Sequence, residues 1–256
     1  MPNSDPQSAA LPDCLSRFPP ALAHSIHNAK ALLFDCDGTL LDTMPTYFKS
    51  WTLTSEELNL PVMTPERFYG YAGLPVGVIF QNLIDEYNDT ASKNGELNTT
   101  VTVARCEETK KIHHHNLVNT GEVWAEEIKC VTEIAKYYRS LTPPKPCAVC
   151  SSGWKDHVVG GLEAVGIDSL FSVVLTASDS DKVKNPKPAG DIWIEACRLL
   201  TIELGEAIEP SSCVGFEDAE LGMKSLAVAN VGCSVDVTRH YHYPRNVEQR
   251  ERGSKA

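Results

Sequence analysis

The chain has 256 residues, a formal net charge of -11, 42% hydrophobic residues and 22% charged residues. These fractions are ordinary for a soluble globular protein, and the length suffices for one large domain or one domain with an insert. A nucleic-acid groove and an anionic membrane surface both select for an excess of Lys and Arg. We therefore expect neither nucleic acid nor membrane as a partner.

Residues 1–28 begin rich in Pro and Ser and then become weakly helical, so we expect a tail followed by an accessory helix. The segment lacks the basic start and apolar core of a secretory signal. No apolar stretch in the sequence approaches the length of about 18 residues that a membrane span needs. Nine cysteines without framework spacing favour a reducing, cytoplasmic compartment, although an organelle address in residues 1–28 stays open.

Short apolar runs alternate with helical patterns along most of the chain. The predicted strands are 31–34, 147–150, 173–175, 213–216 and 233–237. A helix is predicted at about 124–140, and further helices are predicted between the later runs. This alternation is typical of a parallel sheet that is covered by helices on both faces.

Between the first and second predicted strands, residues 45–117 carry a separate helical pattern. Ile79, Leu83 and Tyr87 recur at four-residue steps, which is typical of one face of a helix. A polar loop is predicted at 88–100, where Asn, Asp, Ser, Gly and Thr accumulate. The segment is long enough to form a small helical insert of its own.

Polar side chains follow three of the predicted strands at the point where each strand ends. Asp35 and Asp37 follow the first strand, and Ser151 follows the second. Glu217 and Asp218 follow a third. The carboxyl ends of parallel strands share one edge of the sheet, and open α/β sheets bind ligands at that edge. We therefore expect these side chains to converge.

The loop 183–188 adds a cation to this edge. Lys187 stands between Pro186 and Pro188, and the restricted φ of proline stiffens the chain around it. A lone Asp-x-Asp-Gly would be read as a turn. Four carboxylates, a hydroxyl and an immobilised ammonium together suit phosphoryl transfer instead. One carboxylate can attack phosphorus and a second can transfer a proton, while Mg²⁺, which prefers hard oxygen ligands, screens the charge.

Four segments resemble the motifs of a known family. In chain order they read DCDGTLLDT from Asp35, AVCSSG around Ser151, NPKPAGD around Lys187 and GFEDAELG around Asp218. They resemble the four motifs of the haloacid dehalogenase (HAD) superfamily, in the branch with a helical cap inserted after the first motif. The resemblance spans about residues 30–237. It implies a Rossmann-like, doubly wound parallel sheet with an inserted α-helical cap.

The resemblance also implies roles for individual residues. Asp35 would be the nucleophile, and Asp37 would be the general acid/base and give Mg²⁺ only its backbone carbonyl. The transferring phosphate would be bound by Thr39, Ser151, Ser152 and Lys187. The metal would be held by Asp35, Asp37, Glu217 and Asp218.

Two positions bear on the type of reaction. Asp37 favours a phosphatase or phosphomutase, because superfamily members that attack carbon lack an acid/base at that place. Residues 42–47 resemble fructose-1-phosphate phosphatases and β-phosphoglucomutase-like proteins, which usually have His where this chain has Tyr47. Tyr47 could contact substrate or pack between cap and core, and the sequence favours neither. Residues 70–77 lack the arginine with which mutases hold a second phosphate, which favours hydrolysis.

Three further features receive structural predictions. The consecutive His113, His114 and His115 are predicted to be solvated rather than metal-binding, because successive residues of a helix splay around its surface. Asn230 stands where relatives usually have Gly, and its tolerance of the left-handed conformation predicts that the helix end is kept. Gly222 is predicted to permit close packing of its helix.

The sequence as a whole predicts a Mg²⁺-dependent phosphatase that hydrolyses a sugar or polyol phosphate through an aspartyl-phosphate. A β-phosphoglucomutase-type isomerase and a non-catalytic regulatory or binding protein of the same fold are the alternatives. The expected partner is a small phosphorylated metabolite, with the chain a monomer or homodimer. The predicted division is a core of 29–45 and 118–240, a cap of 46–117, and terminal segments 1–28 and 241–256.

Overall fold

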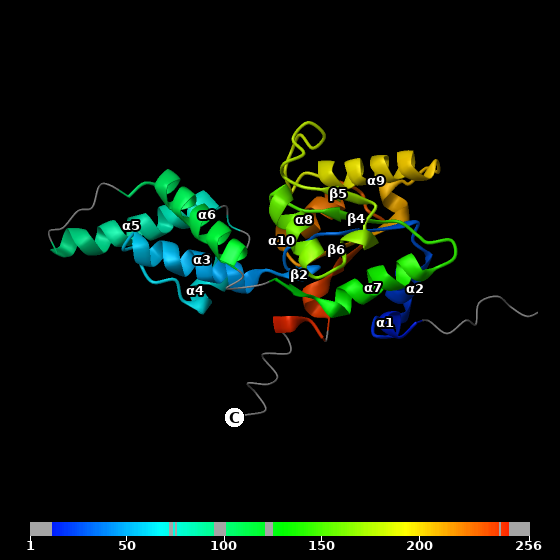
Figure 1. The fold of residues 1–256 in the computed structure, drawn as a ribbon, viewed down its shortest axis with the longest axis horizontal. Helices are drawn as coiled ribbons and strands as arrows, with labels where there is room; N and C mark the ends of the chain where they lie inside the picture. Colours follow the sequence, from blue (N-terminus) through cyan, green and yellow to red (C-terminus); the bar gives the residue numbers. More distant parts are fainter. Residues whose placement is uncertain are drawn as a thin grey trace, which may run out of the picture. The chain divides into compact units, whose positions relative to one another are not determined.

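The computed structural model describes residues 12–71, 74, 76–94, 101–120, 125–240 and 242–245. The chain divides into two compact units (Figure 1). The first, which we call the sheet unit, joins Met1–Asp42 with Glu127–Ala256. The second, which we call the helical unit, is Thr43–Glu126 and is therefore an insertion in the sheet unit.

The sheet unit is built on a five-stranded parallel sheet with strand order β5-β4-β1-β6-β7. The strands are β1 (Ala31–Phe34), β4 (Cys147–Cys150), β5 (Val173–Leu175), β6 (Cys213–Glu217) and β7 (Cys233–Asp236). All four residues of β1 are buried, as expected for a central strand that is covered on both faces. Each predicted strand is confirmed to within one residue, and the Rossmann-like fold class is confirmed.

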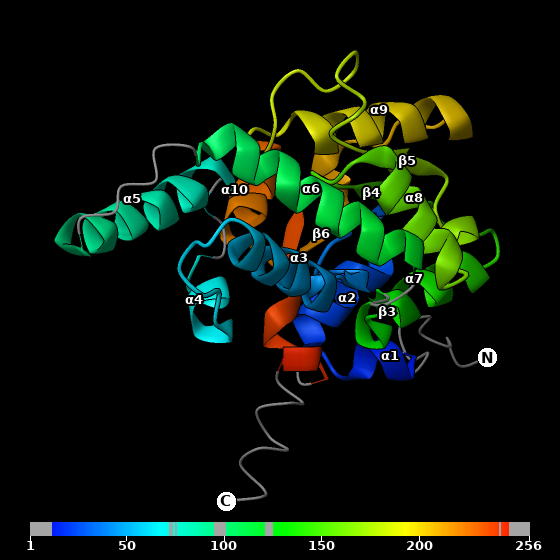
Figure 2. The same ribbon diagram turned by 60° about the vertical axis from the view of Figure 1, so that its left-hand side comes forward.

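Helices cover both faces of this sheet (Figures 1 and 2). They are α1 (Asp13–Ser16), α2 (Pro20–Asn28), α7 (Lys129–Ser140), α8 (Lys155–Ala164), α9 (Asp191–Leu204) and α10 (Glu220–Val228). Ala31 and Leu33 of β1 join the apolar cluster that contains Trp193 of α9. Phe34 points to the other face, because side chains alternate along a strand, and it stacks on Phe216 with ring centroids 4.6 Å apart.

The predicted accessory helix corresponds to α2, which packs beside α7 in the sheet unit. Its Ala23 and Ile26 are buried. His27 Nδ1 lies 2.8 Å from the hydroxyl of Tyr137 on α7. Lys145 donates to the carbonyl of His27 at 2.8 Å. These contacts attach the described part of the N-terminal segment to the sheet unit.

The helical unit consists of α3 (Met44–Glu57), α4 (Pro65–Gly70), α5 (Val76–Asn94) and α6 (Val103–Thr120). Trp51 of α3, Phe80 and Leu83 of α5 and Cys106 of α6 belong to one buried apolar cluster. Among the described residues, no helix combines the length and hydrophobicity that a membrane crossing requires.

Two predicted boundaries differ from the structure. α5 continues to Asn94 and so covers the first part of the loop predicted at 88–100, whereas residues 95–100 lie outside the described chain. The helix predicted from residue 124 begins at Lys129. Glu126–Glu127 instead form the short strand β3, which pairs with β2 (Leu41–Asp42), and residues 121–124 lie outside the described chain.

Candidate active site

The first motif leaves the central strand and turns sharply against the last motif. Asp35 directly follows β1, is 7% exposed and donates its backbone N–H to the Phe216 carbonyl at 3.0 Å. Gly38 has φ +86, a conformation that favours glycine, and its N–H donates to the Leu41 carbonyl at 2.7 Å. A Cβ built at Gly38 would lie 2.4 Å from Asp218 Oδ2. Gly38 therefore allows the loop to fold against the Asp218 carboxylate.

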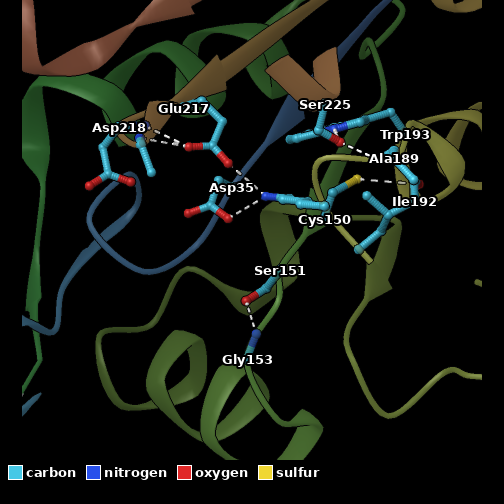
Figure 3. A network of polar contacts seen from close by, with 12 residues as sticks. Asp35, Cys150, Ser151, Gly153, Ala189, Ile192, Trp193, Glu217, Asp218 and Ser225 are labelled. Carbon is cyan, nitrogen blue, oxygen red and sulfur yellow. Dashed lines mark hydrogen bonds and ion pairs between the residues drawn. The ribbon is translucent and has the colours of Figure 1, made fainter. Parts of the chain in front are cut away.

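Three carboxylates and one ammonium form the centre of the site (Figure 3). Asp35, Glu217 and Asp218 each offer one oxygen, and these oxygens lie within 4.8 Å of one another. Lys187 Nζ lies 2.7 Å from Asp35 Oδ1 and 2.7 Å from Glu217 Oε1. Residues from three separate motifs are thus in contact although they are far apart in sequence.

Lys187 is held by the α9 side of the sheet unit as well as by its acidic partners. Its Nζ lies 4.5 Å from the ring centroid of Trp193, which is fully buried and donates to Ser225 Oγ at 2.8 Å. Burial alone would lower the pKa of Lys187, but Asp35 and Glu217 raise it above its ordinary value. The ammonium is therefore permanently charged at neutral pH.

Burial and neighbouring carboxylates raise the pKa of two carboxyl groups of the cluster, those of Asp35 and Asp218. Burial, reinforced by Glu217 and Asp218 and opposed by Lys187, raises the pKa of Asp35 well above its ordinary value. Burial and the neighbouring Glu217 raise the pKa of Asp218 to about 7. Carboxylates that are held together against their repulsion, with oxygens this close, fit a hard divalent cation such as Mg²⁺.

Glu217 differs from the other two carboxylates because both of its oxygens already accept hydrogen bonds. Oε1 accepts from Lys187, and Oε2 accepts from the backbone N–H groups of Asp218 and Ala219, each at 2.9 Å. A Cβ built at Gly222 would lie 1.6 Å from Glu217 Oε1. Gly222 therefore makes room for the Glu217 carboxylate. The sequence predicted only that Gly222 permits close packing of its helix, and this contact is more specific than that prediction.

Asp37 and Ser151 approach each other beside this cluster. Ser151 follows β4, is 1% exposed and accepts a hydrogen bond from Gly153 N–H at 2.9 Å. A Cβ built at Gly153 would lie 3.0 Å from Asp37 Oδ2 and 3.1 Å from Ser151 Oγ, so both oxygens face the same point. Ser151 and Asp35 extend from neighbouring strands, as Figure 3 shows.

The two other predicted phosphate ligands differ in their surroundings. Thr39 is fully buried, and its Oγ1 has no hydrogen-bond partner within the described residues. Ser152 is exposed, and no hydrogen bond from its side chain to the carboxylate cluster is found in the described ranges. The structure thus brings Asp35, Ser151 and Lys187 close to one another. Among the described residues, it shows no such approach for the side chain of Ser152.

Two residues of the predicted C-terminal segment 241–256 contact the site, and sequence reasoning missed both. Tyr243 donates its hydroxyl hydrogen to the Gly38 carbonyl at 2.7 Å. Arg245 Nη2 lies 3.3 Å from Asp218 Oδ2 and donates to Tyr243 Oη at 2.9 Å. The sequence around them indicates only a basic, His-rich tail, so no local pattern predicts the contact.

Tyr47 lies on α3 of the helical unit, where it joins an aromatic and cationic cluster. Its ring stacks on His114 with centroids 4.9 Å apart. Lys110 Nζ lies 5.2 Å from the ring centroids of both Tyr47 and Trp51. Burial lowers the pKa of Lys110 to about 8. Lys110 is thus a cation of the helical unit that lies outside residues 70–77, the segment that lacks an arginine.

The prediction that three consecutive histidines are solvated is wrong for His114. His115 is exposed, whereas His114 is buried and stacks on Tyr47. His113 contacts Glu57, with Nε2 2.8 Å from Oε2. The aromatic partner on α3 gives His114 a packing role that the sequence of α6 alone does not indicate.

Comparison with known proteins agrees with this geometry. A family model described as haloacid dehalogenase-like hydrolase matches residues 32–234, a range that contains the whole carboxylate cluster. The chain belongs to this family. Its membership of the HAD superfamily, predicted from four motifs, is confirmed.

Similar proteins of this family include phosphatases. The fructose-1-phosphate phosphatase YqaB of Escherichia coli is 25% identical over 207 residues, covering 80% of this chain and 95% of that protein. The phosphoglycolate phosphatase of Haemophilus influenzae is 28% identical over 226 residues, covering 87% and 90%. The predicted class of enzyme, a phosphoric monoester hydrolase, is confirmed by this family match and these relatives.

A solved structure supports the fold. The β-phosphoglucomutase of Clostridium difficile superposes with a TM-score of 0.58 at 18% identity, covering 85% of this chain and 88% of that one. At this identity the likeness concerns the fold alone.

Proposed function

We propose that this HAD hydrolase is a Mg²⁺-dependent phosphatase that acts on a small phosphate monoester through an aspartyl-phosphate. One observation carries the proposal. The buried Asp35 carboxylate lies next to two further carboxylates, whose oxygens are within 4.8 Å, and next to a buried ammonium at 2.7 Å. This arrangement places a nucleophile beside groups that can neutralise a phosphate.

Magnesium fits the donor set, because the cluster offers oxygen ligands and excess negative charge. Asp35 and Asp218 would hold the ion, together with Asp37 through its backbone carbonyl. Glu217 would contribute mainly by holding Lys187 and the loop after β6, since its oxygens already accept hydrogen bonds. When bound, the ion would reduce the repulsion between an anionic nucleophile and an anionic phosphate.

Asp35 would attack phosphorus and break the bond to the leaving oxygen, forming the aspartyl-phosphate. Asp37 would give its proton to the leaving oxygen and then take a proton from the water that attacks the intermediate. Lys187 would pair with a phosphate oxygen without losing its charge, and Ser151 would donate its hydroxyl hydrogen to another. The Thr39 hydroxyl, which has no hydrogen-bond partner among the described residues, supports a similar role for that residue.

We assign the substrate to sugar or polyol phosphates. The name of the Escherichia coli relative supports this class, and so does a helical unit in which Lys110, Tyr47 and Trp51 form one cationic and aromatic cluster. The core and cap roles predicted for the two units belong to the same proposal. We propose a cytoplasmic location on the cysteine pattern, because none of the nine cysteines, all of them described, forms a disulfide.

The decisive variant is Asp35→Asn. Loss of the nucleophile should reduce turnover of p-nitrophenyl phosphate on the order of 10³-fold or more, while the circular dichroism spectrum stays unchanged. Asp181→Asn is the matched control, because Asp181 is an exposed acidic residue outside the cluster. Comparable activity of Asp35→Asn and wild type would refute the nucleophile assignment.

One observation keeps an isomerase as the second candidate. Lys110 supplies the helical unit with a cation, and a β-phosphoglucomutase-type reaction needs a second cation for its bisphosphate intermediate. Incubation with β-glucose 1-phosphate separates the two, because a mutase forms glucose 6-phosphate and a phosphatase releases inorganic phosphate. A panel of monoesters without any phosphate release would favour the non-catalytic alternative.

A further inference from the structure

The chain that follows β7 folds back to the active-site loops. We call residues 237–240 and 242–245 the C-terminal strap. It begins with the short helix η3 (Val237–Arg239), where Asp236 accepts from Thr238 N–H at 3.1 Å. Tyr243 N–H donates to the His240 carbonyl at 3.0 Å, and the Tyr243 side chain is 2% exposed. The strap is therefore an ordered part of the sheet unit.

Hydrogen bonds join the strap to the Gly38 loop and to Asp218 of the site. Arg245 Nη2 donates to Tyr243 Oη at 2.9 Å, and Tyr243 Oη donates to the Gly38 carbonyl at 2.7 Å. The same Nη2 lies 3.3 Å from Asp218 Oδ2. The Arg245 guanidinium also lies 5.1 Å from the Tyr243 ring centroid. The guanidinium is thus positioned by an aromatic ring and a hydroxyl before it meets the carboxylate.

Arg245 and Lys187 divide the acidic cluster between them. Lys187 contacts Asp35 and Glu217, whereas the ion-pair partner of Asp218 in the described chain is Arg245. Asp218 is 9% exposed and Arg245 is 36% exposed at the side chain, so the pair lies at the rim of the cluster. The exposure of Arg245 lets its guanidinium move into solvent, whereas the Asp218 carboxylate stays largely buried and needs another cation when Arg245 leaves.

A divalent ion in the proposed site would compete with Arg245 for the same carboxylate. Ligand oxygens approach Mg²⁺ to about 2.1 Å, so an ion on Asp218 would stand within a few ångströms of the guanidinium. Two cations at such a separation repel each other. Ion binding therefore has to weaken the Arg245–Asp218 pair.

We propose that Arg245 is a positioning residue whose ion pair with Asp218 is exchanged for the divalent ion. Arg245 neutralises Asp218 while the metal is absent and moves away when the metal binds. This inference rests on the metal site of the proposed function. Coupling between two binding events is reciprocal. Displacement of Arg245 therefore weakens metal binding, and metal binding weakens docking of the strap by the same free energy.

Titration calorimetry with MgCl₂ on the full-length protein tests the exchange. Arg245→Met should bind Mg²⁺ about fivefold more tightly than wild type, which is the upper range expected for a solvent-accessible ion pair. Arg245→Lys keeps the charge and should retain the wild-type Kd. Arg239→Met is the matched control, because Arg239 lies in the same strap but pairs with Asp236 at 2.9 Å and is 85% exposed. Unchanged or weaker binding by Arg245→Met would overturn the proposal.

Hydrogen exchange of peptides that span 237–245 supplies a readout independent of turnover. Addition of Mg²⁺ should lower the protection of the wild-type strap and leave that of Arg245→Met unchanged. A wild-type strap whose protection does not respond to bound Mg²⁺ would also overturn the exchange. If wild type binds Mg²⁺ and hydrolyses p-nitrophenyl phosphate, but neither the calorimetry nor the hydrogen exchange gives the expected result, the exchange alone is refuted. Wild type that binds no Mg²⁺ would refute the metal site itself.

Discussion

At the scale of single residues, the main feature of the site is that it contains more carboxylates than cations. Lys187 lies 2.7 Å from both Asp35 and Glu217, and its side chain is 7% exposed. Asp218 therefore depends on Arg245 at the rim and on any divalent ion that binds. Burial and Glu217 raise the pKa of Asp218 to about 7, so its protonation state changes near neutral pH.

The raised pKa of Asp218 predicts a pH-dependent stability of the metal-free protein. Its folded pKa of about 7 exceeds the ordinary value of 3.8, so the folded state takes up a proton that the unfolded chain does not. The resulting stabilisation is complete below about pH 4 and is lost as the pH rises through about 7. In acid, Asp218→Asn should therefore have the same free energy of unfolding as wild type. In mild alkali, its free energy of unfolding should be higher than that of wild type by on the order of 1–3 kcal/mol.

Urea unfolding in the presence of EDTA measures this difference. Asp168→Asn is the control, because Asp168 is exposed on the short helix η1 (Asp168–Leu170). Asp218→Asn that is less stable than wild type in alkali would mean that Arg245 stabilises the anion more than burial and Glu217 disfavour it.

At the scale of secondary-structure elements, the start of α10 is shaped around a buried carboxylate. Glu217 ends β6, and its Oε2 accepts from the N–H groups of Asp218 and Ala219 just before the helix. A carboxylate at a helix N-terminus is stabilised by the unpaired N–H groups there. The side chain fits because Gly222, in the first turn of α10, has no Cβ.

Gly222→Ala should therefore be far more damaging than an ordinary Gly-to-Ala change in a helix. The new Cβ would lie 1.6 Å from Glu217 Oε1, so Glu217 must move and release Lys187. We expect a loss of about 2–4 kcal/mol in the free energy of unfolding, together with a large fall in phosphatase activity. Thermal and urea unfolding provide the measurement.

Gly160→Ala in α8 is the matched control, because a Cβ there would meet no atom within 4 Å. Helix propensity predicts that this control gains about 0.5–1 kcal/mol. Equal effects of the two substitutions would show that Glu217 does not need the space at Gly222.

At the scale of the whole molecule, the two units carry different kinds of chemistry. The carboxylates and Lys187 belong to the sheet unit, whereas Tyr47, Lys110 and His114 belong to the helical unit. Lys110 is held over two aromatic rings, and its pKa falls to about 8 because burial disfavours its charge. Our proposal that the helical unit recognises an anionic substrate would account for the retention of a cation at this position at a cost in stability.

Lys110→Met should accordingly make the helical unit more stable and the enzyme less selective. Removal of the half-desolvated charge is expected to add about 1 kcal/mol to the free energy of unfolding, and the gain should shrink as the pH rises above about 8. The KM for sugar phosphates should rise, with little change for p-nitrophenyl phosphate. Lys111→Met, which removes an exposed charge one residue away, should alter neither property.

Local sequence patterns determined much of this protein. Apolar runs of strand length placed β1, β4 and β6, because a strand buried on both faces needs an uninterrupted apolar segment, whereas the edge strand β7 is only partly buried and includes polar residues. The left-handed Asn230, with φ 55, follows from its residue type at a helix end. Asp35, Ser151 and Asp218 could be found because each follows a strand whose end lies at the same edge of the sheet.

Only the tertiary structure decided the contacts that no short pattern encodes. Arg245 reaches Asp218 and His114 stacks on Tyr47 across separations of many residues, and neither position carries a local signal of its partner. The space that Gly222 leaves for Glu217 is likewise set by the meeting of a strand end and a helix. Such contacts depend on where whole elements pack, so periodicity and motif spacing locate the elements and leave the side-chain partners to the fold.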